Sequence, residues 1–125
     1  MASIEPELWV ERAASAARFY SDAFGATVVF QVGEGEDVVT RLDVDGARFW
    51  VAAADSRIRR RAPDEFQGAT GRVLLVLPDP AAVVVAAEAA GATATAEVTE
   101  EHGWLLGRIV DPFGHEWEIG RHLAD

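Results

Sequence analysis

Apolar and polar residues follow two periods along this chain, one typical of helices and one typical of strands. The segments Ala16–Phe30 and Ala81–Glu97 both begin with an Ala-rich helical pattern that runs into Gly-Ala-Thr. Their glycines, Gly25 and Gly91, lie 66 positions apart. A glycine just after the last periodic residue is typical of a left-handed helix cap. The pattern therefore predicts two helices, each ending at its glycine.

Strand-like stretches surround both predicted helices in the same order. Short apolar runs, Leu8–Val10 and Val73–Leu77, precede them. Three alternating stretches follow each helix, at residues 26–32, 37–43 and 47–54 and again at 92–98, 104–110 and 115–120. A D-x-x-G turn introduces the last stretch of each half and ends at Gly46 or Gly114, which are 68 positions apart. The chain is therefore predicted to be an α+β protein built from two βαβββ modules.

The length of 125 residues fits one domain with a substantial core. Module one is expected over residues 1–54, a linker over 55–71 and module two over 72–125. The two modules must bury their apolar sheet faces against each other or against a partner chain. The linker carries the arginine cluster Arg57–Arg61, which indicates either an anion site or a solvated loop face. The solvated face is the commoner case for loops.

Composition narrows the classes of partner. The chain has 21 acidic residues and 11 basic ones, and every basic residue is Arg. The net charge of −10 argues against binding to nucleic acid, because such a chain repels phosphate. The same charge suits a cationic ligand, or simply keeps the protein soluble. No apolar run reaches the roughly 20 residues that span a bilayer, and no signal-peptide pattern opens the sequence. Without Cys there is no thiolate ligand or nucleophile. We expect a cytoplasmic protein that binds neither nucleic acid nor membrane.

Two motifs carry a family resemblance, "FYSDAFGA" near the first predicted helix and "DPFGHEWEI" near the end of the chain. With the repeated βαβββ pattern, they make the chain resemble the vicinal oxygen chelate superfamily. This group includes glyoxalase I, fosfomycin resistance enzymes, extradiol dioxygenases and bleomycin resistance proteins. The resemblance implies a curved, partly open mixed sheet from each module, a pocket enclosed by the sheets, and a homodimer. It does not imply one activity, because this fold serves several.

Metal-using relatives bind one divalent ion with four inward side chains, from the first and last strands of each module. Carried over by the resemblance, these positions are Glu5, Trp50, Arg72 and Glu118, with Glu7 as the alternative to Glu5. A tryptophan donates nothing to a metal ion, and a guanidinium group repels one. We therefore predict no metal. If a metal is present, its ligands are Glu118 and either Glu5 or Glu7.

Arg72 is expected instead to pair with Glu118 or Glu5 inside the pocket, in the two-pronged geometry that suits a guanidinium group. An arginine beside Glu118 argues against general-base chemistry at that carboxylate. None of the three histidines restores a ligand set, since His115 faces away from Glu118 by strand alternation. No catalytic residue and no cofactor is assigned.

The four tryptophans divide between pocket and core. Trp50 occupies a site position in the resemblance, and Trp104 follows the Gly103 break, where it can line a rim. Trp9 and Trp117 are predicted to belong to the core, because buried aromatic rings are common there.

The sequence thus predicts a metal-independent protein that sequesters a small cationic aromatic compound or antibiotic. Trp50 would stack on the ligand, and Glu5, Glu7 or Glu118 would meet its positive groups. One alternative is a metal-dependent glyoxalase-like lyase, isomerase or dioxygenase. A second is a non-catalytic interaction protein with a degenerate cavity.

Overall fold

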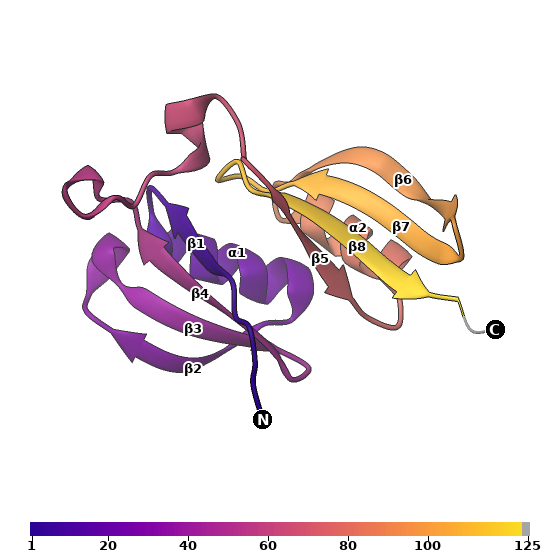
Figure 1. The fold of residues 1–125 in the computed structure, drawn as a ribbon, viewed down its shortest axis with the longest axis horizontal. Coiled ribbons are helices and arrows are strands. Elements are labelled where there is room, and N and C mark those ends of the chain that lie inside the picture. Colours follow the sequence, from indigo (N-terminus) through magenta and orange to yellow (C-terminus); the bar gives the residue numbers. More distant parts are fainter. Residues whose placement is uncertain (124–125) are drawn as a thin grey trace.

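The computed structural model describes residues 1–123, apart from the side chain of Phe66, and shows a βαβββ order twice (Figure 1). The first module contains β1 (Glu7–Val10), α1 (Ala13–Phe24), β2 (Thr27–Val32), β3 (Val39–Val44) and β4 (Ala47–Ala53). The second contains β5 (Arg72–Val76), α2 (Pro80–Ala89), β6 (Thr93–Glu101), β7 (Trp104–Val110) and β8 (Glu116–His122). The α+β class and the repeat predicted from the sequence are confirmed.

Each module forms its own four-stranded mixed sheet, in the orders β1-β4-β3-β2 and β5-β8-β7-β6. The first strand of each module pairs in parallel with its last strand, and the other neighbours are antiparallel. In this register Arg41 lies opposite Trp50 in the first sheet, and Arg108 lies opposite Glu118 in the second. Positions 67 or 68 apart in the sequence are therefore structurally equivalent.

The helix of each module covers one face of its sheet (Figure 1). Strand side chains point alternately to the two faces, so every second residue of a strand faces the helix. In β3 the alternation is complete, and its helix-facing residues Thr40, Leu42 and Val44 are buried. The helices α1 and α2 pack against each other, so the two modules share one apolar interior. Among the described residues, no helix combines the length and the apolar character needed to cross a membrane.

The ring of Trp117 links the two modules inside this interior. It is only 1% exposed, and its centroid lies 4.8 Å from that of Phe24 and 5.4 Å from that of Phe49, both in the first module. The prediction that Trp117 belongs to the core is confirmed. Trp9 was expected there as well, but it is only partly buried, because it shares its strand face with the exposed Glu7.

The buried carboxylate of Asp111 makes the second connection between the modules. Its Oδ1 accepts backbone N–H bonds from Phe113 (2.9 Å) and His115 (3.0 Å), which shape the turn before β8. Its Oδ2 accepts from Trp117 Nε1 (2.9 Å) and from the Tyr20 hydroxyl on α1. Burial, reinforced by the Asp111 charge, raises the pKa of Tyr20 well above its ordinary value. The "FY" and "DPFGHEW" motifs therefore supply an internal junction of the fold.

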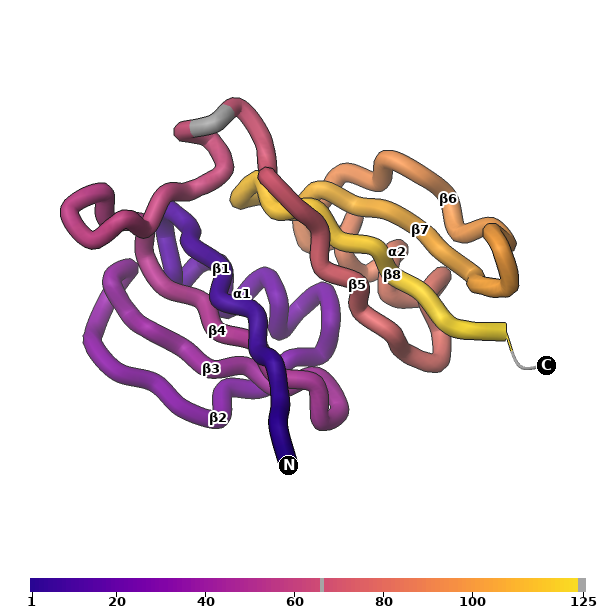
Figure 2. The backbone as a smooth tube through the Cα atoms, in the orientation of Figure 1, coloured from indigo at the N-terminus to yellow at the C-terminus, as the bar shows by residue number. Residues whose placement is uncertain are grey.

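The linker runs from the first module to the second along one side of the molecule (Figure 2). It contains two short 3-10 turns, η2 (Ser56–Ile58) and η3 (Pro63–Phe66). A third turn, η1 (Gly35–Asp37), joins β2 to β3.

Candidate functional site

The sheet surfaces that face away from the helices are uncovered, and each is called here the open face of its sheet. Both open faces expose apolar side chains. On the first sheet, Phe30 and Val32 of β2 are 49% and 55% exposed. On the second, Leu74 and Val76 of β5 are 43% and 51% exposed. The family site positions carried over from the sequence lie on these same faces.

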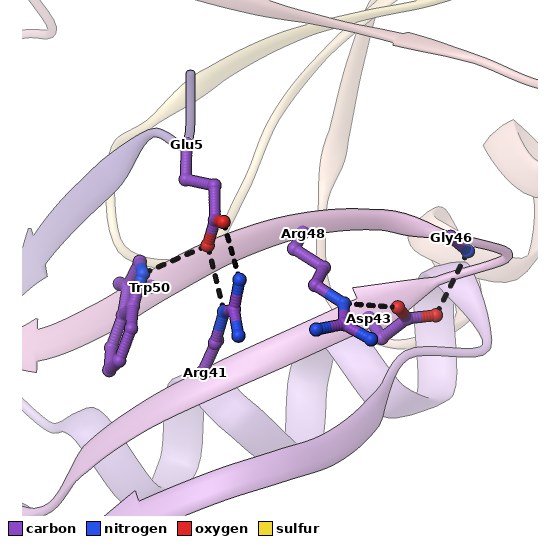
Figure 3. Close-up of polar contacts among 6 residues, drawn as sticks. All are labelled: Glu5, Arg41, Asp43, Gly46, Arg48 and Trp50. Atoms are coloured by element: carbon purple, nitrogen blue, oxygen red, sulfur yellow. Dashed lines mark hydrogen bonds and ion pairs between the residues drawn. The ribbon is translucent and has the colours of Figure 1, made fainter. Parts of the chain in front are cut away.

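Glu5, Arg41 and Trp50 form a hydrogen-bonded cluster on the first open face (Figure 3). Arg41 donates from Nε to Glu5 Oε1 (2.8 Å) and from Nη2 to Glu5 Oε2, and Trp50 Nε1 donates to Oε1 (3.0 Å). The hydrogen bond from Arg41 is the main reason that the pKa of Glu5 lies below its ordinary value. Glu5 is therefore an ionised carboxylate with both oxygens engaged.

The indole ring of Trp50 is held from two further directions. The guanidinium carbon of Arg41 lies 5.6 Å from the ring centroid, within the range of a cation–π contact. The ring of Phe30 meets Trp50 edge to face, with centroids 5.8 Å apart. Phe30 and Trp50 thus form an aromatic patch on the open face, bordered by one guanidinium group.

A second ion pair lies farther along the same sheet, at the β3–β4 turn (Figure 3). Asp43 accepts a hydrogen bond from the backbone N–H of Gly46 (3.0 Å) and one from Arg48 Nε (2.9 Å). These contacts, the Gly46 bond first, hold the pKa of Asp43 below its ordinary value. This pair fixes the turn and leaves the aromatic patch uncovered.

Arg108 occupies the centre of the second open face. Its Nε donates to Glu118 Oε2 (3.1 Å), and its Nη2 donates to Glu101 Oε1 (3.3 Å). The hydrogen bond to Glu101 is the main reason that the pKa of Arg108 is raised above its ordinary value. One guanidinium group thus joins carboxylates from two neighbouring strands.

The predicted two-pronged pair between Arg72 and Glu118 is wrong in its geometry. Arg72 makes one ion-pair contact with Glu118, at 4.0 Å, and its side chain is 45% exposed. The reason is the strand register, which places Arg108 directly opposite Glu118, so that the nearer guanidinium group takes the carboxylate.

The structure also separates the two candidates near the start of the chain. Glu5 bonds to Arg41 and Trp50, whereas Glu7 is exposed and lines a groove between the modules. Trp104 begins β7 opposite His122, and their ring centroids lie 4.9 Å apart. Trp104 therefore lies at the end of the second open face, away from Glu118.

The residues at the four family positions do not fit a divalent metal ion. Such an ion needs several N or O donors at about 2.0–2.2 Å. Here Trp50 and Arg72 offer none, and Glu5 and Glu118 already accept bonds from guanidinium groups. Within residues 1–123, no three His, Cys, Asp or Glu side chains are grouped closely enough to hold a metal.

Sequence reasoning missed Arg41 and Arg108, the central residues of both clusters. A signal was present, because the two arginines lie 67 positions apart and each precedes the D-x-x-G turn of its module. Extending the repeat to the third strand of each module would have placed both arginines beside the last strand.

Comparison with known proteins agrees with this architecture. The family model described as Glyoxalase/Bleomycin resistance protein/Dioxygenase superfamily matches residues 3–119. Uncharacterized proteins of Mycobacterium bovis and Mycobacterium tuberculosis are each 30% identical over 98% of this chain, which corresponds to 85% and 76% of their own lengths.

Solved structures show the same fold. A gene product from Arabidopsis thaliana is 30% identical, with a TM-score of 0.74, over 95% of this chain and 98% of its own. The fosfomycin resistance protein FosX from Listeria monocytogenes, in a mutant form complexed with Mn(II), has a TM-score of 0.73 over 100% of this chain and 92% of its own. At 13% identity, FosX shows likeness of fold alone. This chain belongs to the glyoxalase/bleomycin resistance protein/dioxygenase superfamily.

Proposed function

We propose that this protein binds a small aromatic molecule on its open faces, without a divalent metal ion at the four family positions. The observation that carries the proposal is the occupation of both remaining carboxylates. Glu5 is held by Arg41, and Glu118 is held by Arg108. Since a guanidinium group stays charged at any accessible pH, no change of pH frees these carboxylates by removing their partners.

The aromatic patch supports the ligand class. Phe30 is half exposed, and Trp50 presents part of its ring on the same face. Aromatic walls with a few fixed polar groups are typical of small-molecule sites. Glu5 and Glu118 are already paired with arginines, so they do not select a positively charged ligand. The ligand is therefore proposed to be aromatic without the positive charge that the sequence suggested.

The ion pairs of Glu5 and Glu118 favour a binding protein over an enzyme. A general base works best when its pKa lies near the operating pH. Arg41 lowers the pKa of Glu5, which makes this carboxylate a weaker base. A metal-dependent lyase or dioxygenase would need donors at positions where this chain has Trp50 and Arg72.

We also propose that a second copy of the chain covers the open faces. Exposed apolar side chains on both sheets, among them Phe30, Val32, Leu74 and Val76, favour burial in such a contact. Light scattering at micromolar concentration should give twice the chain mass of 13.5 kDa. A monomer at all concentrations would contradict this part.

The ligand proposal is tested by calorimetric titration with a panel of uncharged, cationic and anionic aromatic compounds, with and without EDTA. Truncating Trp50 or Phe30 to Ala should weaken the best binder by about tenfold, because each removes an aromatic contact and its buried area. Val85→Ala is the matched control, since Val85 is exposed on the opposite, helical side. Binding that needs added metal, or that survives both aromatic truncations unchanged, would refute the proposal.

A further inference from the structure

The groove that Glu7 lines between the modules, called here the linker groove, lies beside the linker. Its volume is about 380 Å³, within the range of small-molecule sites. It is lined by β1, by the linker and by the segments that begin β5 and β8. Glu5, Arg41 and Trp50 are absent from its lining, so the linker groove is separate from the aromatic patch.

The arginines of the linker have different surroundings: Arg57 is paired with a carboxylate, whereas Arg59 and Arg61 line the groove. Asp55 and Arg60 exchange two backbone hydrogen bonds (2.8 and 3.0 Å), which close the loop between them. The Asp55 carboxylate accepts from the backbone N–H, Nε and Nη2 of Arg57, so this arginine is neutralised. Arg59 has a left-handed backbone, with φ of 65°, an uncommon conformation for a side chain this large. The closed loop leaves Arg59 and Arg61 lining the linker groove.

Positive charge exceeds negative charge along the lining. Three guanidinium groups, those of Arg59, Arg61 and Arg72, face two carboxylates, those of Glu7 and Glu116. Within the described part of the chain, Arg59 and Arg61 form no ion pair within 4.0 Å. In a protein with a net charge of −10, this is a local reversal of sign.

The linker is packed firmly against the second module. A Cβ placed on Gly114 would lie 2.9 Å from Pro63 Cβ, so the turn before β8 tolerates only glycine against this part of the linker. His115, in the same turn, also reaches the first module, and its Nε2 donates to the Trp9 carbonyl (2.8 Å). The arginine-bearing loop thus adjoins fixed walls.

One segment of the lining supplies further hydrogen-bond donors. The segment Gly68–Gly71 has small side chains, which leave its backbone accessible along the linker groove. Trp9 also lines the groove, but its indole nitrogen is buried away from the groove surface. The accessible backbone N–H groups favour a ligand that carries acceptor oxygens.

We propose that the linker groove binds a small organic molecule through a compact anionic group, a phosphate or a carboxylate, held by Arg59 and Arg61. A guanidinium group presents two parallel N–H donors that match the oxygens of either anion. Glu7 and Glu116, which also line the groove, disfavour additional negative charge on the ligand. The groove volume leaves room for an organic body beside Trp9.

The test is an NMR titration of the ¹⁵N-labelled protein with inorganic phosphate and, separately, with succinate, at constant ionic strength. At least one probe should shift the amides of Gly68–Gly71 and the Trp9 indole in a saturable way. The double variant Arg59→Gln/Arg61→Gln should weaken that binding by about tenfold or more, because two charge-assisted donors are lost. Which probe binds more tightly identifies the anionic group.

Two further variants separate a specific site from diffuse charge attraction. Glu7→Gln should strengthen binding of the anion about threefold, because it removes a negative charge from the groove. Misfolding cannot produce such a gain. Arg121→Gln removes one exposed positive charge outside the groove and should change nothing. The proposal is overturned if neither probe saturates, if the double variant binds as the wild type does, or if Arg121→Gln weakens binding equally.

Discussion

The two open faces have the same framework and place their charges differently. Arg41 and Arg108 are equivalent, and each lies directly opposite the site position of the last strand. In the first module that position is Trp50, and the carboxylate comes from Glu5 ahead of the first strand. In the second module the last strand itself supplies the carboxylate, Glu118. A guanidinium group at the equivalent position of each sheet thus meets a carboxylate at a family site position, and the two modules reach this arrangement by different routes.

The turn aspartates show how strongly burial changes the role of one motif. Asp43 and Asp111 are equivalent and begin the same D-x-x-G turn, 68 positions apart. Asp43 lies near the surface and pairs with Arg48. Asp111 is 4% exposed and accepts four hydrogen bonds from both modules. The motif sets the turn, but only the second copy joins the modules.

The largest expected effect comes from removing the buried turn aspartate, Asp111. Asp111→Ala leaves the Tyr20 hydroxyl, the Trp117 indole and two backbone N–H groups without their acceptor. We expect it to lower the free energy of unfolding by roughly 3–5 kcal/mol. Asp43→Ala is the matched control and should cause little change, since exposed ion pairs contribute little. Urea denaturation of both variants measures the difference, and equal losses would contradict the distinction between the two turns.

A smaller effect is expected on the titration of Glu5. Arg41→Gln should raise the pKa of Glu5 toward its ordinary value, because the main hydrogen bond that lowers it is lost. Arg108→Gln, the equivalent change in the second module, should leave the pKa of Glu5 where it is. A ¹³C NMR titration of the Glu5 carboxyl carbon measures both. Equal shifts in the two variants would show that the modules are not electrostatically independent.

The ion pair between Glu5 and Arg41 also affects how the stability of the protein changes at acidic pH. Because the pKa of Glu5 is lowered in the folded state, its contribution to stability is present above the unfolded pKa of about 4.3 and is lost as pH falls through the folded value. The Arg41→Gln variant should therefore lose less stability than the wild type on acidification below about pH 4.

Much of the fold could be predicted from the sequence, because repeats, caps and turns are local signals. The glycines at Gly25 and Gly91 adopt the expected left-handed backbone, with φ of 70° and 116°. The orientation of Trp50 and Glu118 followed from strand alternation. What the sequence could not provide was the pairing across strands. Arg41 and Arg108 act on residues of a neighbouring strand, and only the register shows which side chains meet there.

Because the sequence does not show which side chains meet across strands, it could not decide between Glu5 and Glu7 or find the partner of Arg72. Glu5 lies two residues ahead of Glu7, so strand alternation alone predicts the same orientation for both and does not separate them. The contact with Arg41 does, because it holds Glu5 beside Trp50. Arg72 was expected to pair with Glu118 because it occupies a family site position, but Arg108 lies nearer to Glu118 in space.

We propose that guanidinium groups take the place of a metal ion on the open faces. The most direct measurement combines elemental analysis of the purified protein with calorimetric titration of Zn²⁺, Mn²⁺ and Ni²⁺. We expect no stoichiometric metal, no saturable heat and no change in melting temperature. A specific metal site would raise the melting temperature by mass action. One equivalent of bound metal per chain, with a melting temperature raised by the ion in the wild type but not in Glu118→Gln, would contradict it.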